Sequence, residues 1–130
     1  MTDREAEKIL VIEDDQFLRE LYEELLKGEG YSVELAEDGE KGLSKFLEGG
    51  YSLVLLDIML PKIDGLEILR KAKDSKPKKE NGPVVLLTNL GQDSIIKEGF
   101  SLGVSGYLVK SAMNPDQVLK EVKVFLNKGK

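Results

Sequence analysis

The sequence predicts an α/β fold in which a doubly wound, five-stranded parallel sheet carries helices on both faces. Five short apolar runs recur along the 130 residues, and the segments between them have apolar residues at helical spacing. Strands that alternate with helices in this way are typical of right-handed βαβ units, which lie parallel in one sheet. The runs are residues 9–12, 33–36, 53–56, 84–87 and 107–109.

The five runs differ in how fully we expect them to be buried. The first, third and fourth are continuously apolar and consist of Val, Ile and Leu, which is typical of strands covered on both faces. The second run contains Glu34, and we therefore expect it to lie near an edge of the sheet.

Start and stop signals mark the first three helices. Asp15 is the expected N-cap of the first, which ends at Gly28, and the second ends at residues 49–50. Asp64 is the expected N-cap of the third helix, and Glu67 stands three residues later in the capping-box position.

The last two helices differ in how clearly the sequence marks them. The fourth, around Ile95, has few apolar residues and contains Gly99, so we expect it to be the most mobile helix. The fifth has Asn114 as a cap, Pro115 in its first position and Gln117 in the capping-box position.

Length and composition restrict the chemistry of the chain. A chain of 130 residues suits one domain, 1–130, with a core expected at 8–126. The sequence contains no cysteine and no histidine, which excludes disulfides, thiolate or imidazole metal sites and a Ser-His-Asp triad. Any chemistry must therefore come from carboxylates, hydroxyls and lysines, with the metal or phosphate that they bind.

Charge and hydropathy limit the expected partners and location. The net charge is −5, which disfavours general binding of nucleic acid, and the basic run at 70–79 fits a solvated helix end. The first residues do not resemble a targeting signal, and no apolar run is long enough to span a membrane. We therefore expect a cytoplasmic protein without direct nucleic-acid or membrane contacts.

Polar side chains follow four of the five expected strands. Glu13 and Asp14 follow the first strand, and Asp57 follows the third. Thr88 follows the fourth strand and Lys110 follows the fifth. Because ligands bind beyond the carboxyl ends of parallel strands, we expect these five side chains to form one site.

The residue types of this site favour metal-assisted phosphoryl transfer onto an aspartate. Clustered carboxylates repel one another unless a cation neutralises them, and Mg²⁺ prefers such oxygen ligands. Lys110 is a point charge suited to phosphate, and Thr88 can donate a hydrogen bond to a phosphoryl oxygen. A carboxylate such as Asp57 can itself accept the phosphoryl group as a nucleophile.

Four motifs in order resemble the receiver domain of two-component response regulators, over nearly the whole length from 8 to 126. They are Lys-Ile-Leu-Val-Ile-Glu-Asp at 8–14, Asp-Ile-Met-Leu-Pro-Lys-Ile-Asp-Gly at 57–65, Leu-Leu-Thr at 86–88, and Gly-Tyr-Leu-Val-Lys at 106–110. The resemblance implies a flavodoxin-like (βα)5 fold and a phosphorylation-controlled signalling switch.

The resemblance also implies roles for the residues that match. Asp57 is the phosphoacceptor, which receives its phosphoryl group from a histidine kinase or a phosphotransfer protein, and Lys110 pairs with the phosphorylated Asp57. The only chemistry implied is the chain's own phosphorylation and dephosphorylation, so the protein is not expected to be an enzyme for other substrates. The implied Mg²⁺ ligands are Glu13, Asp14, Asp57 and the backbone carbonyl of Met59.

Two further residues are implied to carry the switch. Thr88 moves to bond the phosphoryl group, and Tyr107 swings inward into the space that is vacated. The face formed by the fourth helix, fifth strand and fifth helix then changes and regulates an unidentified downstream protein. The chain is expected to be a monomer or a phosphorylation-dependent dimer.

Four positions depart from the family pattern or modify the site. Ser111 stands where the family usually has a proline, often after a cis bond, so we expect a trans bond there. Asn89 replaces a small residue and could narrow access to Asp57 or add a hydrogen bond. Apolar Met59 and Leu90 are expected to shield the aspartyl phosphate from water.

Three alternative functions compete with this one. An aspartate-nucleophile phosphatase needs a second acid two residues after the nucleophile, where this chain has Met59. A nucleotide-binding domain lacks support, since the sequence has neither a P-loop nor a Gly-x-Gly-x-x-Gly motif after a strand. A receiver-like docking module that accepts no phosphate is kept open by Ser111 and Asn89.

Overall fold

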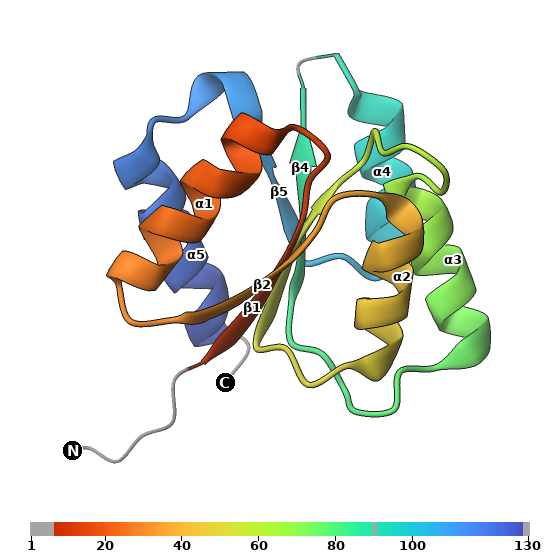
Figure 1. Ribbon diagram of the computed structural model, residues 1–130. Helices are drawn as coiled ribbons and strands as arrows, with labels where there is room; N and C mark the ends of the chain where they lie inside the picture. Colours follow the sequence, from red (N-terminus) through yellow and green to blue (C-terminus); the bar gives the residue numbers. More distant parts are fainter. Residues whose placement is uncertain (1–6, 90, 129–130) are drawn as a thin grey trace.

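A single parallel sheet with strand order β2-β1-β3-β4-β5 organises the computed structural model, which describes residues 7–89 and 91–128 (Figure 1). This arrangement confirms the predicted doubly wound sheet, and β2 with its Glu34 lies at one edge as expected. The strands are β1 (Lys8–Ile12), β2 (Ser32–Ala36), β3 (Leu53–Asp57), β4 (Val84–Thr88) and β5 (Gly106–Val109).

Helices cover both faces of the sheet. Helices α1 and α5 lie on one face, and α2, α3 and α4 lie on the other (Figure 1). No helix within 7–89 or 91–128 is long and apolar enough to cross a membrane. The helices are α1 (Gln16–Gly28), α2 (Gly39–Glu48), α3 (Gly65–Ser75), α4 (Asp93–Ser101), the 3₁₀ turn η1 (Lys110–Ala112) and α5 (Pro115–Lys128).

The predicted helix caps are present. Asp15 accepts a hydrogen bond from the Leu18 amide at 3.0 Å, and Asp64 accepts one from the Glu67 amide at 2.9 Å. At the start of α5, Gln117 N donates to Asn114 Oδ1 and Asn114 N donates to Gln117 Oε1, both at 2.9 Å. This reciprocal pair is a capping box, so local sequence fixes where these helices begin.

Two apolar cores, one on each face, explain the continuous apolar runs. Neighbouring residues of a strand point to opposite faces, so Ile9 packs with the core under α1 and α5 while Leu10 packs with the core under α2 and α3. Both side chains are fully buried. Burying both faces of the central strands in this way is what fixes the sheet between two helical layers.

Strand register brings the carboxyl ends of the central strands level with one another. Ile12 pairs with Leu56 across β1 and β3, and Asp57 pairs with Leu87 across β3 and β4. Thr88 in turn lies opposite Val109 of β5. The residues that end or follow these strands are therefore placed side by side, which is the condition for a shared site.

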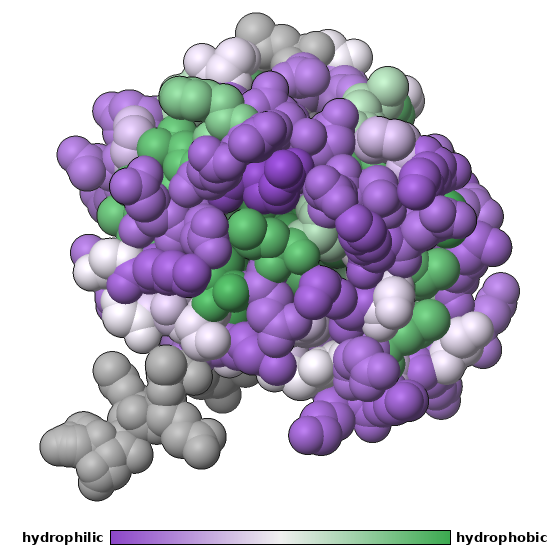
Figure 2. Space-filling view, viewed as in Figure 1, coloured by the Kyte–Doolittle hydropathy of each residue, from purple (hydrophilic) through white to green (hydrophobic). Residues whose placement is uncertain are grey.

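The edge strand β2 is only partly covered. Figure 2 shows this side of the molecule, where an apolar patch lies within a mainly hydrophilic surface between the helices that flank the sheet (Figure 2). Val33 and Leu35 of β2 are partly buried against the core on the α1 side. Only one neighbour, β1, hydrogen-bonds to this strand in the described sheet.

Candidate functional site

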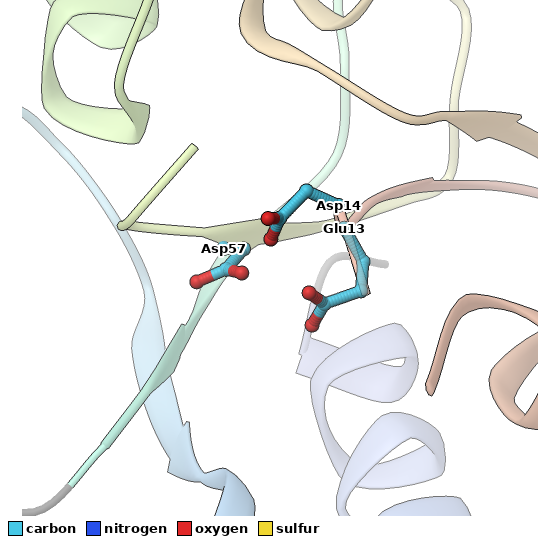
Figure 3. A group of neighbouring side chains, drawn as sticks. All are labelled: Glu13, Asp14 and Asp57. Carbon is cyan, nitrogen blue, oxygen red and sulfur yellow. The ribbon is translucent and has the colours of Figure 1, made fainter. Parts of the chain in front are cut away.

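Three carboxylates meet at the carboxyl ends of β1 and β3. Glu13, Asp14 and Asp57 each offer an oxygen, and these oxygens lie within 4.8 Å of one another (Figure 3). Glu13 is fully buried and Asp57 is 3% exposed, whereas Asp14 is exposed. We call these three residues the acidic cluster. Asp14 is therefore the member of the acidic cluster that faces solvent.

Lys110 bridges the two buried members of the acidic cluster. Its Nζ lies 3.0 Å from Glu13 Oε1 and 3.0 Å from Asp57 Oδ2. Burial opposes the charge of the ammonium, but hydrogen bonds and charge attraction from Glu13 and Asp57 outweigh it and raise the pKa of Lys110. Lys110 therefore stays charged, and its placement beside Asp57 is achieved with Ser111 in the next position.

Burial and mutual repulsion disfavour the negative charge of the carboxylates in the acidic cluster. Burial, followed by the hydrogen bond and charge of Asp57, raises the pKa of Glu13 from 4.5 to about 7. Lys110 pairs with two of the three carboxylates, and an added cation would relieve the remaining repulsion. A donor set made only of carboxylate oxygens, open to solvent on one side, fits a hard divalent cation such as Mg²⁺.

Backbone amides complete the surroundings of the two buried carboxylates. The Met59 amide donates to Asp57 Oδ1 at 3.2 Å, and the Asp15 amide donates to Glu13 Oε2 at 3.1 Å. Each bond spans two residues, so each carboxylate is held by the loop that follows its own strand. The side chain of Met59 is 58% exposed at the surface beside the cluster.

The two predicted switch residues lie in different surroundings. Thr88 is buried at the end of β4, and its hydroxyl donates to the Leu108 carbonyl at 3.4 Å. Tyr107 is 44% exposed on β5, and its ring packs edge-on against Phe100 of α4 with centroids 6.4 Å apart. The structure therefore brings Thr88 to the edge that carries the cluster and leaves Tyr107 facing outward.

The positions that depart from the family pattern have defined local structure. Ser111 lies in η1, and every peptide bond between described residues is trans, as expected. The Asn89 amide donates to Gln92 Oε1 at 2.7 Å, which ties it to the start of α4. Leu90, expected to shield the phosphate together with Met59, lies outside the described residues.

One residue beside this site, Arg19 of α1, was not predicted from the sequence. Its Nη1 donates to the backbone carbonyls of Glu13 at 3.0 Å and Asp14 at 3.1 Å. Arg19 sits on a helix of alternating charge, where an arginine is ordinarily a solvated residue. Only its spacing, one turn after the cap Asp15, could have pointed to the preceding loop.

Comparison with known proteins identifies the family. The model of the response regulator receiver domain matches residues 9–123. The chain belongs to this family. Switching controlled by phosphorylation is the general function of receiver domains, and they bind Mg²⁺ at an acidic pocket. The fold and the acidic cluster described above agree with both properties.

Curated relatives of this receiver are transcriptional regulators. The chain is 35% identical over 122 residues to the transcriptional regulatory protein ResD of Bacillus subtilis, covering 94% of the chain and 49% of ResD. It is 38% identical over 117 residues to DltR of Streptococcus agalactiae, covering 90% of the chain and 50% of DltR. The receiver thus spans about half the length of these relatives.

Solved structures share the fold over nearly the whole chain. A CheY-like receiver domain protein from Methanospirillum hungatei has a TM-score of 0.83 at 28% identity, covering 95% of this chain and 96% of that one. The response regulator TrrA of Thermotoga maritima, solved in complex with Mg²⁺ and BeF, has a TM-score of 0.75 at 35% identity, covering 92% and 98%.

Proposed function

We propose that Asp57 is the phosphoacceptor of this receiver and that Glu13, Asp14, Asp57 and the Met59 carbonyl hold the Mg²⁺ ion. The observation that carries the proposal is the bridge of Lys110 to Glu13 and Asp57, with Asp14 beside them. Asp57 lies on the central strand β3, where Lys110 pairs with one of its oxygens and the Met59 amide with the other. A bound Mg²⁺ would supply charge neutralisation for the incoming phosphoryl oxygens.

The reaction transfers a phosphoryl group from a phosphohistidine of a histidine kinase or phosphotransfer protein. An oxygen of Asp57 attacks phosphorus, the P–N bond to the donor imidazole breaks, and the imidazole keeps the electron pair of that bond. The product is an aspartyl phosphate, and attack by water later returns the carboxylate and inorganic phosphate. Lys110 offsets the charge that builds up on the phosphoryl oxygens.

The switch follows from the new charge on Asp57. Thr88 would release the Leu108 carbonyl and turn its hydroxyl toward a phosphoryl oxygen. Tyr107 would leave its outward position against Phe100 and occupy the space beside Thr88. The surface of α4, β5 and α5 would then bind or release a downstream protein, and the proposed donor places these events in the cytoplasm.

The exposed Met59 argues against the phosphatase alternative. Aspartate-nucleophile phosphatases resemble this site in their first acid but place a general acid two residues later. Here that position holds a thioether, which cannot donate a proton to a leaving group. The site therefore favours a stable aspartyl phosphate over rapid turnover of phosphate esters.

Intact mass after incubation with Mg²⁺ and acetyl phosphate tests the proposal. We expect a single phosphoryl adduct on the wild type and none on Asp57→Asn or in the presence of EDTA. Asp64→Asn is a matched control, because asparagine also caps a helix and this residue lies at the start of α3. An adduct on Asp57→Asn, or none on folded wild type, would contradict the proposal, and the second result would favour the docking module.

A further inference from the structure

A half-buried arginine on helix α1 forms hydrogen bonds with the loop that carries two of the three acids. Arg19 Nη1 donates to the carbonyl of Glu13 at 3.0 Å and to the carbonyl of Asp14 at 3.1 Å. We propose that Arg19 is a positioning residue for the metal site: it fixes the peptide planes of Glu13 and Asp14 so that both carboxylates face Asp57. This inference rests on the proposed metal site and concerns how that site is built.

The loop needs such support because the strand ladder stops before it. β1 pairs with β2 as far as Ile12, and the Glu13 amide makes one more bond, to the Ala36 carbonyl at 3.1 Å. The carbonyls of Glu13 and Asp14 lie beyond this ladder. Backbone carbonyls at a partly buried turn require donors, and the Arg19 guanidinium supplies them.

Arg19 is itself held in place by the start of α1. Its amide donates to the Asp15 carbonyl at 2.9 Å, and the Asp15 side chain caps the helix through the Leu18 amide at 3.0 Å. The Asp15 amide in turn donates to Glu13 Oε2 at 3.1 Å. The loop and the first turn of α1 therefore form one hydrogen-bonded unit, in which a shift of the guanidinium would move the acids.

Arg19 and Lys110 differ in the hydrogen-bond acceptors that they contact. Lys110 pairs with carboxylate oxygens, which are the atoms that would bind a metal. Arg19 instead bonds the backbone carbonyl oxygens of Glu13 and Asp14 on the loop. A guanidinium suits this task, because its planar fork directs N–H groups in fixed directions that an ammonium does not reproduce.

Magnesium titration followed by amide chemical shifts tests the role of Arg19. For the full chain without phosphodonor, we expect Arg19→Gln to bind Mg²⁺ about 10-fold more weakly than wild type, as when groups that orient metal ligands are removed. Arg19→Lys should recover part of this loss. Arg70→Gln is the matched control, because Arg70 pairs with Glu67 and Glu98 on α3 and α4, away from the β1–α1 loop.

Urea unfolding in EDTA provides the readout that separates positioning from general stability. A purely structural role would lower the free energy of unfolding of Arg19→Gln and leave the Mg²⁺ affinity of its folded form unchanged, which would overturn the inference. If Arg19→Gln does not fold, Arg19→Lys decides: weakened binding supports the role, and wild-type affinity overturns it. Failure of the wild type to bind Mg²⁺ would instead overturn the proposed site, and this inference with it.

Discussion

At the carboxyl ends of the strands two buried carboxylates share one ammonium beside a third acid, whereas at the β2 edge one carboxylate contacts two ammoniums and a phenol. The second group, here called the β2 edge cluster, consists of Glu34, Lys8, Lys45 and Tyr51. Glu34 lies 3.2 Å from Lys8 Nζ and 3.1 Å from Lys45 Nζ, and it accepts a hydrogen bond from the Tyr51 hydroxyl at 2.9 Å.

The pKa values of two glutamates in one small fold are therefore shifted in opposite directions. Burial, with Asp57 adding to it, raises the pKa of Glu13 to about 7. Burial alone would also raise the pKa of Glu34, but the bonds from Lys45, Tyr51 and Lys8 lower it overall. In the β2 edge cluster the protein's own side chains balance the charge of Glu34. In the acidic cluster the negative charges still repel one another, and an added cation would relieve this repulsion.

Replacing Lys110 with Met should produce the largest effect, because it removes the one ammonium that the acidic cluster has. In EDTA we expect Lys110→Met to lower the free energy of unfolding by about 3 kcal/mol, the usual cost of leaving a buried charge without its partner. Saturating Mg²⁺ should restore part of this loss. Urea unfolding in EDTA and in Mg²⁺ measures both quantities.

Lys45→Met, which removes an ammonium from the β2 edge cluster, is the matched control for this experiment. Glu34 keeps Lys8 and Tyr51 and is partly exposed, so the expected loss is below about 1 kcal/mol and does not depend on Mg²⁺. An equal loss of unfolding free energy in the two variants would contradict the proposed difference between the clusters. It would show that the acidic cluster depends on its ammonium no more than the β2 edge cluster does.

Glu13→Gln should produce the next largest effect, with a sign that depends on pH. Because the folded pKa of Glu13 is raised from 4.5 to about 7, wild type in EDTA loses stability as pH rises through this window. At about pH 8 we expect Glu13→Gln to be more stable than wild type by on the order of 2 kcal/mol. This advantage should vanish as pH falls toward 4.5, where Glu13 is protonated in both folded and unfolded chains.

Magnesium should reverse the order of the two proteins. Wild type gains stability from a ligand that binds only its folded state, and Glu13→Gln, with one carboxylate fewer, gains less. Urea unfolding of both proteins at several pH values, with and without Mg²⁺, gives four curves of unfolding free energy against pH. A Glu13→Gln variant less stable than wild type at about pH 8 in EDTA would contradict the interpretation of Glu13.

The acidic cluster could be predicted from the sequence because each of its residues ends a strand or directly follows one. Continuous apolar runs predict buried parallel strands, and parallel strands place the residues after them at one edge of the sheet. Glu13, Asp57 and Lys110 therefore required only the strand positions and the order of the helices. The helix caps Asp15 and Asp64 were equally local, and the structure confirms both.

The β2 edge cluster and the role of Arg19 could not be predicted, because each depends on contacts between groups whose relative position in the fold the sequence does not encode. Glu34 meets Lys45 and Tyr51 across eleven and seventeen positions, so their meeting depends on how α2 packs on the sheet. Arg19 is near the loop in sequence, but a helical arginine can turn toward many acceptors. The outward position of Tyr107 likewise depends on its packing against Phe100.

Tyr51→Phe should give a smaller effect than Lys110→Met or Glu13→Gln, and it isolates one bond of the β2 edge cluster. The ring stays in place, with Lys8 Nζ 4.9 Å from its centroid, so the variant loses only the hydroxyl that donates to Glu34. We expect the free energy of unfolding to fall by about 1 kcal/mol, the usual value of such a bond. Mg²⁺ affinity, followed by the same amide titration, should not change.

The pH window of this loss distinguishes the two clusters. A carboxylate whose folded pKa is lowered stabilises the protein above its unfolded value and loses that contribution as pH falls through its folded pKa. The difference between wild type and Tyr51→Phe should therefore be constant above about pH 5 and shrink below 4.5, where Glu34 takes up a proton. The Glu13→Gln difference changes above 4.5, so two variants whose differences followed the same pH curve would show that the clusters do not titrate separately.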